Sequence, residues 1–370
     1  MRNSITTHGD IGERLLSLDV FRGLTMFLLI AEFTHIFSLL VDSAFEGTIA
    51  AAIGRQFHHH PWNGLRFWDM IQPFFMFIVG VAMPFSFGRR WARGDTWKQT
   101  FGHAGFRAGF LLFLGWALYC IEPGRITFRF DNVLAQLSVT YLIAFLIMRK
   151  RTGIQILISL SLILLAEGLY RFWPVAGFDQ AFVPDKNFGA WFDLFVTGHL
   201  NPGHWVIFNA VPTTAHTIWG VLAGLVLRSS RNSSRKIGLL AAAGLIGVSA
   251  GFALNPLTPI IKRICTSSFI FVSGGFCLLS LALFYWLFDV RKVRRFSIFL
   301  AVVGMNPLFI YLFSHTGGVN WLRRLVSPFT GGLLGWAGRL PAEIILALLL
   351  WGLLWGICWW LYMRRIFIKI

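Results

Sequence analysis

Three consecutive histidines, His58, His59 and His60, lie directly before a Pro-Trp-Asn-Gly run at residues 61–64, and Asp69 follows near the start of a long apolar run. Histidine has an ordinary pKa of about 6.5, so it takes up and releases protons near neutral pH. Such a ring serves as a general base, and it also carries an acyl group in covalent catalysis. Because most of the chain is apolar, we expect the chemistry of this protein at this stretch.

Two other interpretations of the histidines remain open, a solvated loop patch and a metal site. Zinc sites need side chains that converge on one ion, whereas three consecutive rings do not converge and no acidic residue lies three or four positions away. The four cysteines are widely spaced and form no Cys-x-x-Cys pair. The sequence therefore predicts neither a metal nor a disulfide framework.

The composition is that of a polytopic membrane protein. The 370 residues are 56% hydrophobic and only 13% charged, with a mean hydropathy of +0.66, whereas soluble domains carry roughly 25% charged residues. The net charge of +17 would suggest nucleic acid as a partner of a soluble protein. In a membrane protein it reflects loops that fix orientation, so we expect lipid and not nucleic acid around this chain.

The pattern predicts an all-α fold in which residues 1–370 form a single transmembrane domain. A span needs about 20 apolar residues. The first fourteen residues are polar and Leu15 opens a full-length span, so no cleaved signal peptide is expected. About ten spans are expected, at residues 15–40, 67–88, 105–121, 132–148, 153–171, 205–227, 236–254, 266–288, 296–314 and 341–362.

The distribution of basic residues predicts the topology. Most lysines and arginines lie in every second loop and at the chain ends, from Arg2 and Arg14 to Arg364, Arg365 and Lys369. By the positive-inside rule both termini are cytoplasmic, in a multi-pass protein of the inner (cytoplasmic) membrane. The histidines then lie outside, and the long outer loops 172–204 and 315–340 are expected to form a cap.

A few polar residues interrupt the spans, where they are costly and tend to face the bundle interior. Each has a structural interpretation beside a functional one. Asp19 and Arg22 are three residues apart, so they can pair on one helix face or meet the phosphates of a cytoplasmic ligand. The other positions can bridge helices or mark a kink; they are Glu32, Asp69, Asn132, Gln136 and Asn306.

Taken together, these motifs resemble the transmembrane acetyltransferase family typified by heparan-α-glucosaminide N-acetyltransferase, and the chain is similar to its bacterial members. The first two motifs are the most specific. The resemblance extends over nearly the whole chain, through residues 14–25 (RLLSLDVFRGLT), 59–65 (HHPWNGL), 73–80 (PFFMFIVG), 132–137 (NVLAQL), 211–215 (VPTTA), 220–224 (GVLAG), 266–268 (TSS) and 304–307 (GMNP).

The resemblance implies an acetyltransferase that moves an acetyl group from cytoplasmic acetyl-CoA to the amine of a glucosamine-like sugar outside. The family pattern His-x-x-Trp selects His59 as the catalytic residue, either as a base or as an acetyl carrier. Glu32 stands near the place where the lysosomal enzymes have an asparagine, and it and Asp69 are expected to assist His59. A homodimer is expected from the resemblance alone.

The remaining candidate residues fall into two groups. Asp19, Arg22, Asn132, Gln136 and Asn306 are expected to contact acetyl-CoA. Trp62, Asn63, Asn187 and Asp193 are expected to contact the sugar, because aromatic faces stack on sugar rings and polar groups bind hydroxyls.

Two other functional classes remain. A transporter or flippase for a sugar or an anionic metabolite would also use buried polar residues and broken helices such as the one expected at Asn306. A binding or scaffold protein of the cell envelope is the other.

Overall fold

The computed structural model describes residues 15–121 and 123–368, and every regular element within these ranges is helical. The topology prediction also used Arg2, Arg14 and Lys369, which lie outside the described residues. The first fourteen residues, on which the signal-peptide prediction rests, lie outside them too. The helices used below are α1 (Leu16–Glu32), α2 (Ile36–Leu39), α3 (Ile49–Gln56), η2 (Phe67–Met70), α4 (Ile71–Ala92), α5 (Trp97–Ile121), α6 (Val133–Ile147), α7 (Thr152–Phe172), α8 (Phe188–Thr197), α9 (Ala210–Arg228), α10 (Ser233–Leu254), α11 (Ser267–Phe284), α12 (Ser297–Met305), α13 (Pro307–His315), α14 (Gly318–Leu334) and α15 (Arg339–Met363).

The all-helical, multi-pass character expected from the composition is confirmed. Among the described residues, seven helices are long and apolar enough to cross a membrane, and the bent pair of α12 and α13 makes up to eight. The predicted count of ten also includes α1 and α6, which are shorter, at 17 and 15 residues. The count of ten and the orientation of the termini stay predictions.

Two of the predicted spans are interrupted. The span expected at residues 15–40 ends as a helix at Glu32, because His35 adopts a left-handed conformation with φ of 66° before α2 begins. The span expected at 296–314 bends by 68° between α12 and α13, where Pro307 cannot continue the hydrogen bonding of the preceding helix. The loops 172–204 and 315–340, which were expected on the outer side, contain helices of their own, α8 and α14.

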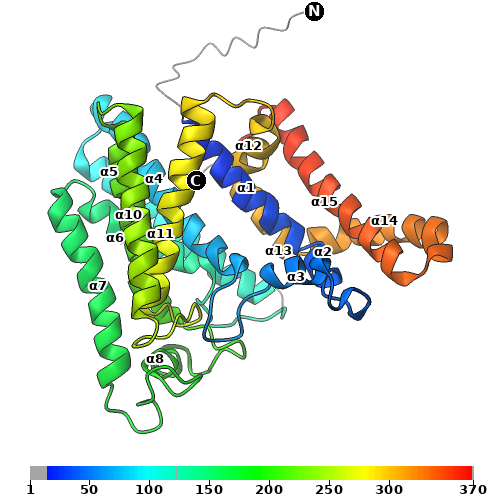
Figure 1. Ribbon diagram of the computed structural model, residues 1–370, viewed down its shortest axis with the longest axis horizontal. Helices are drawn as coiled ribbons and strands as arrows, with labels where there is room; N and C mark the ends of the chain where they lie inside the picture. Colours follow the sequence, from blue (N-terminus) through cyan, green and yellow to red (C-terminus); the bar gives the residue numbers. More distant parts are fainter. Residues whose placement is uncertain (1–14, 122, 369–370) are drawn as a thin grey trace, which may run out of the picture.

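Close packing of α4 against α9 forms the centre of one group of helices. Gly80 and Gly220 lie where the two backbones meet, and a Cβ at Gly80 would fall 2.1 Å from the carbonyl oxygen of Thr217. Small residues allow this approach, as is usual between membrane helices. Helices α5, α7 and α10 lie at the outside of this group (Figure 1), packed on α6, α9 and α11. Most of their apolar residues are not buried, as expected for a lipid-facing layer.

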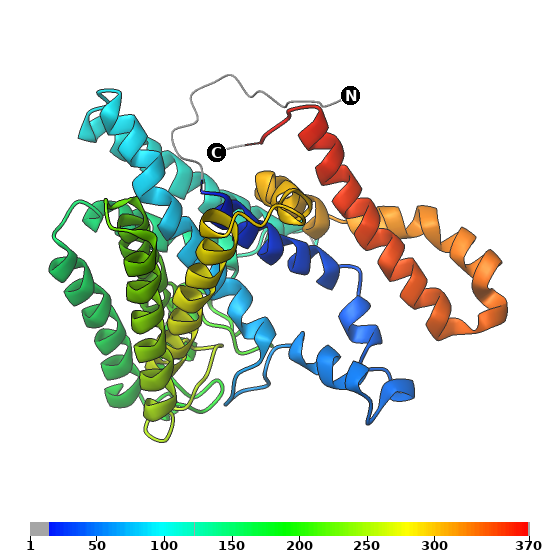
Figure 2. The same ribbon diagram turned by 45° about the horizontal axis from the view of Figure 1, so that its top comes forward.

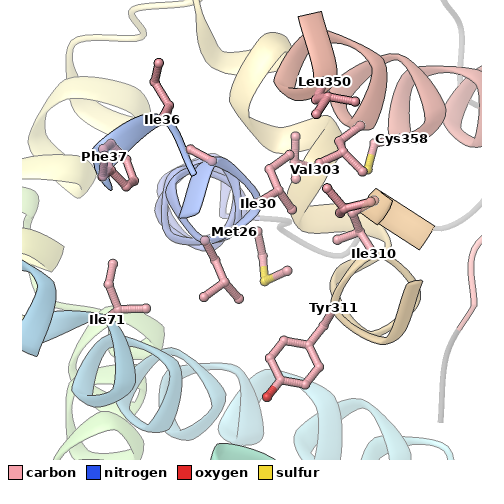
Figure 3. Packing of buried hydrophobic residues seen from close by; sticks show 14 of the residues in the cluster. Met26, Ile30, Ile36, Phe37, Ile71, Val303, Ile310, Tyr311, Leu350 and Cys358 are labelled. Carbon is pink, nitrogen blue, oxygen red and sulfur yellow. The ribbon is translucent and has the colours of Figure 1, made fainter. Parts of the chain in front are cut away.

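A second hydrophobic cluster joins α1 to the C-terminal helices. Met26 and Ile30 on α1 pack with Val303 on α12, Ile310 on α13 and Leu350 on α15 (Figure 3). Helix α1 also contacts α4 and α11, so it lies between the two groups.

The two ends of the molecule differ in what they carry. The start of α1, the end of α15 and the connection from α4 to α5 lie at one end (Figures 1 and 2). Helix α8 and the connection from α10 to α11 lie at the opposite end (Figure 1). The histidine loop, which precedes η2 and α4, lies toward this second end, and the site described next is built there.

Candidate active site

The carboxylate of Asp69 organises the histidine loop. Asp69 lies in η2 with its side chain buried, and its Oδ2 accepts hydrogen bonds from the backbone N–H groups of Arg66 at 2.9 Å and His60 at 3.2 Å. The Arg66 guanidinium in turn donates to the carbonyl oxygen of His59 at 3.1 Å. A carboxylate at a helix start satisfies N–H groups that the helix itself leaves unbonded. The loop therefore folds around this one acid.

The other oxygen of Asp69 holds the ring of His59. The distance from Nδ1 of His59 to Oδ1 of Asp69 is 2.9 Å, and the histidine side chain is 32% exposed while the aspartate is 1% exposed. The second ring nitrogen, Nε2, is bonded to none of the described residues and is not among the buried unpartnered atoms. The ring is thus fixed at one nitrogen and open at the other.

The three neighbouring histidines have different environments. His58 binds the carbonyl oxygen of Gly54 through Nδ1 at 2.9 Å, on α3. The His60 ring packs on Gly64, where a Cβ would lie 2.5 Å from its Nε2 and where φ is +147°, so only glycine fits there without strain. Only His59 pairs with a buried carboxylate.

A second loop, between α10 and α11, brings a lysine to the same ring. Nζ of Lys262 lies 3.1 Å from Nδ1 of His59 and 3.9 Å from Oδ1 of Asp69, with its side chain 7% exposed. The loops are joined by a hydrogen bond from the N–H of Gly64 to the carbonyl oxygen of Ile260 at 2.9 Å. Two segments about 200 residues apart in sequence therefore meet at His59.

Trp205 forms a wall of the site. Its ring lies edge-on to His59 with centroids 5.2 Å apart. Nζ of Lys262 and Cζ of Arg263 lie 5.4 and 5.3 Å from the Trp205 ring centroid, within the range of cation–π attraction. The indole thus holds two cations beside the histidine.

The electrostatics of the site keep the imidazole neutral. Burial and the nearby Lys262 charge lower the pKa of His59 to about 4, against the opposing effect of Asp69. Burial also lowers the pKa of Lys262 to about 8, although Asp69 opposes the shift. At neutral pH the site therefore contains an uncharged ring between a carboxylate and a lysine that titrates within reach of physiological pH.

Glu32, expected to assist His59, reaches the His59–Asp69 pair only through Trp68. Its Oε1 accepts a hydrogen bond from Nε1 of Trp68 at 3.1 Å, and Trp68 directly precedes Asp69 in η2. Glu32 also interacts electrostatically with Lys262. Glu32 therefore holds Trp68 and faces Lys262, and it makes no hydrogen bond to His59.

The expected sugar-binding residues do not gather at His59 as a group. Trp62 donates from Nε1 to the carbonyl oxygen of Phe182 at 2.7 Å, and Asn63 is exposed. Asn187 caps α8 by accepting from the N–H of Ala190 at 3.2 Å. Asp193 accepts from the N–H of Ile207 at 2.9 Å, and burial raises its pKa to about 7. Asn187, which caps α8, and Asp193 within α8 are both buried.

The expected acetyl-CoA contacts are spread along the bundle. Asn132 caps α6 by accepting from the N–H groups of Leu134 and Ala135 at 3.0 Å, and it donates to the carbonyl oxygen of Gly115 at 2.7 Å. Gln136 accepts a hydrogen bond from Gln72, which lies one turn beyond Asp69.

The other three positions of this group lie elsewhere. Asn306 binds the chain end, donating to the carbonyl oxygen of Ile366 at 2.9 Å and accepting from the N–H of Ile368 at 2.8 Å. On α1, Nη1 of Arg22 lies 4.0 Å from Oδ1 of Asp19.

The sequence pattern does not point to Lys262. In the sequence it is one of the minority of basic residues on the predicted extracytoplasmic side. A signal is nevertheless present, because Lys262 and Arg263 lie in a loop of otherwise uncharged residues, on the side where the positive-inside rule predicts few basic residues. No three His, Cys, Asp or Glu side chains form a metal-binding group within the described part of the chain.

Comparison with known proteins gives two relatives, and no protein-family model matches. Over 135 residues the chain is 27% identical to heparan-alpha-glucosaminide N-acetyltransferase from Homo sapiens. The matched residues make up 35% of this chain and 18% of that protein. The Mus musculus protein of the same name is 27% identical over 142 residues, 37% of this chain and 19% of its own length. The matched stretch thus spans less than a fifth of these relatives, and over about a third of its length this chain is similar to heparan-α-glucosaminide N-acetyltransferase, as its motifs predicted.

Proposed function

We propose that this protein is a membrane acetyltransferase that transfers the acetyl group of cytoplasmic acetyl-CoA to the amine of a glucosamine-like sugar on the extracytoplasmic side. The observation that carries the proposal is the His59–Asp69 pair, in which one ring nitrogen faces a buried carboxylate at 2.9 Å and the other is unbonded. Similarity to proteins named N-acetyltransferases supports the reaction class. A transporter needs no oriented imidazole of this kind.

In the proposed reaction His59 is the general base. A sugar amine is mostly protonated in water, so its neutral fraction attacks the thioester carbon, and its N–H becomes acidic as the N–C bond forms. With the ring proton held on Nδ1 by Asp69, Nε2 offers its lone pair to the amine proton. The N–C bond forms, the C–S bond breaks, and the proton taken up at Nε2 passes to the CoA thiolate.

The two-step alternative uses the same nitrogen as a nucleophile. Nε2 of His59 would attack the thioester, release CoA and carry the acetyl group until the sugar amine takes it. Rapid quenching with labelled acetyl-CoA and no sugar separates the two routes. Label on His59 supports the carrier, and its absence with transfer intact supports direct transfer.

Helix α4 supports an arrangement in which donor and acceptor approach from opposite sides. Asp69 precedes its first residue, and Arg89 and Arg90 lie in its last turn. Its 22 residues span about 33 Å, close to the roughly 30 Å thickness of a bilayer core. Exposed arginines such as Arg89 and Arg93 suit the phosphates of CoA, because guanidinium groups bind phosphate through paired hydrogen bonds. The acetyl-bearing arm would then reach His59 past the Gln72–Gln136 pair.

Purified protein with labelled acetyl-CoA and glucosamine tests the proposal. We expect His59→Ala to lower the rate of acetyl transfer by about 10²–10⁴-fold, the usual contribution of a general base. His58→Ala is the matched control, because His58 lies next to His59 but binds Gly54 instead of a carboxylate. Equal rates in the two variants would contradict the assignment of His59. Uptake of the sugar without acetylation would favour the transporter.

A further inference from the structure

One nitrogen of His59 has two competing partners. Nδ1 lies 2.9 Å from Oδ1 of Asp69 and 3.1 Å from Nζ of Lys262. A carboxylate only accepts hydrogen bonds and an ammonium only donates them. Nδ1 satisfies Asp69 when it carries the ring proton, and it satisfies a charged Lys262 when it does not. The two contacts hold together only when Lys262 is a neutral amine, since one N–H can then be shared between two acceptors.

We propose that Lys262 is a positioning residue whose proton decides which nitrogen of His59 is basic. With Lys262 charged, its ammonium donates to Nδ1 and the ring proton resides on Nε2, which then has no lone pair for a substrate. With Lys262 neutral, Nδ1–H donates to Asp69 and Nε2 is free to accept. This inference deepens the proposed function, because it concerns the base of that reaction.

The surroundings of Lys262 favour such a switch. Its side chain is buried and meets charges of both signs: Asp69 in η2, Glu32 on α1, and Arg263 in its own loop. Cys265, in the same loop, and the Trp205 ring complete its neighbours. Burial lowers the pKa of Lys262 to about 8, so a modest rise in pH converts much of it to the amine.

The loop is built to hold this lysine in place. The N–H of Ile261 donates to Oγ1 of Thr266 at 3.0 Å, and that hydroxyl donates to the carbonyl oxygen of Pro259 at 2.7 Å. Ile261 and Ile264 on either side of Lys262 are fully buried. These contacts hold Lys262 beside Nδ1 of His59. A change in the protonation of Lys262, and not a movement of its side chain, is therefore what alters the contact.

The rate at which diethyl pyrocarbonate modifies His59 measures the proposal directly. The reagent acylates an unprotonated ring nitrogen, and only Nε2 is free to meet it. The full-length protein in nanodiscs is treated at pH 7, 8 and 9, and modification of His59 is measured by peptide mass spectrometry. His58, next to it on the same peptide, serves as the reference for reagent loss at each pH.

The two obvious variants are expected to change the profile in opposite directions. In the unaltered protein the rate at His59 should rise about tenfold from pH 7 to 9, as a group with a pKa near 8 loses its proton. Lys262→Met removes the competitor, so the rate should be high at pH 7 and flat above it. Lys262→Arg keeps the charge at every pH, so the rate should stay low. Lys186→Met, which changes an exposed lysine just before α8, should keep the tenfold rise.

Two results would overturn the inference: a flat profile in the unaltered protein, or a rise that persists in Lys262→Met. A misfolded Lys262→Arg would leave the comparison between the methionine variant and the unaltered protein to decide. The chemical readout does not depend on acetyl transfer. If no transfer is found while the profile follows Lys262, the proposed function fails and the switch stands.

Discussion

The loop site at His59 and the polar positions inside the bundle are built from similar residues but end in different states. At the loop site, Asp69, His59 and Lys262 converge from two segments and leave one ring nitrogen without a partner. Inside the bundle, Asn132 caps a helix and Asn306 holds the chain end, each through both ends of its amide.

The difference teaches how to recognise a site in a membrane protein. A polar residue in an apolar segment is expensive to bury, so it must be hydrogen-bonded. Most such residues meet that need within the fold and have no capacity left for a ligand. What marks the His59 site is a titratable group that is held at one atom and available at another.

Among variants that keep His59, the largest expected effect is that of Asp69→Asn. An amide in place of the carboxylate presents either its oxygen or its NH₂ group to Nδ1, and it no longer fixes the ring proton there. We expect the rate of acetyl transfer to fall by about 10²-fold or more, measured with labelled acetyl-CoA.

The chain offers a matched control for this variant. Asp185 and His204, on either side of α8, form another pair, with Oδ2 of the aspartate 2.8 Å from Nδ1 of the histidine and both side chains 36% exposed. Asp185→Asn should leave the transfer rate nearly unchanged. Equal losses of transfer rate in Asp69→Asn and Asp185→Asn would mean that both Asp–His pairs stabilise the fold and that Asp69 has no special role at His59.

Asn132→Ala should instead destabilise the protein. The variant loses a helix cap and leaves the carbonyl oxygen of Gly115 without its donor. We expect the free energy of unfolding to fall by about 1–3 kcal/mol, measured by thermal unfolding in detergent, with the KM for acetyl-CoA unchanged. A raised KM with unchanged stability would instead make Asn132 a ligand contact, as the sequence predicted.

A further prediction concerns the pH dependence of stability at Asp193, where burial raises the pKa to about 7. Between its ordinary pKa of 3.8 and pH 7 the folded state binds more protons than the unfolded state. This contribution to stability is therefore present below pH 3.8 and is lost as the pH rises through 7. Asp193→Asn should remove that decline, as measured by the melting temperature from pH 5 to 8. A decline that persists in the variant would assign it to another group.

Much of this arrangement could be predicted from local sequence. Long apolar runs set apart by basic loops predicted helices of membrane-spanning length, because burial of apolar side chains dominates such segments. The bend at Asn306 and Pro307 followed from the missing N–H of proline. The break at His35 could not be foreseen, since a left-handed residue other than glycine has no distinct local signal.

The candidate site divides along the same line. Its histidine and aspartate lie ten residues apart, within one loop and the helix start that follows. The local sequence motif was therefore enough to predict His59 and Asp69 as site residues. Lys262 and Trp205 come from distant loops, and their meeting depends on how α9, α10 and α11 pack.

By itself, the sequence determined the helical membrane character of this protein, the place of its histidine motif and its resemblance to an acetyltransferase family, because each is written in neighbouring residues. Only the tertiary structure decided which polar side chains are satisfied within the fold and which remain available. It alone placed Lys262 against Nδ1 of His59, because the partner of a hydrogen bond between loops depends on packing across the whole bundle and not on spacing along the chain.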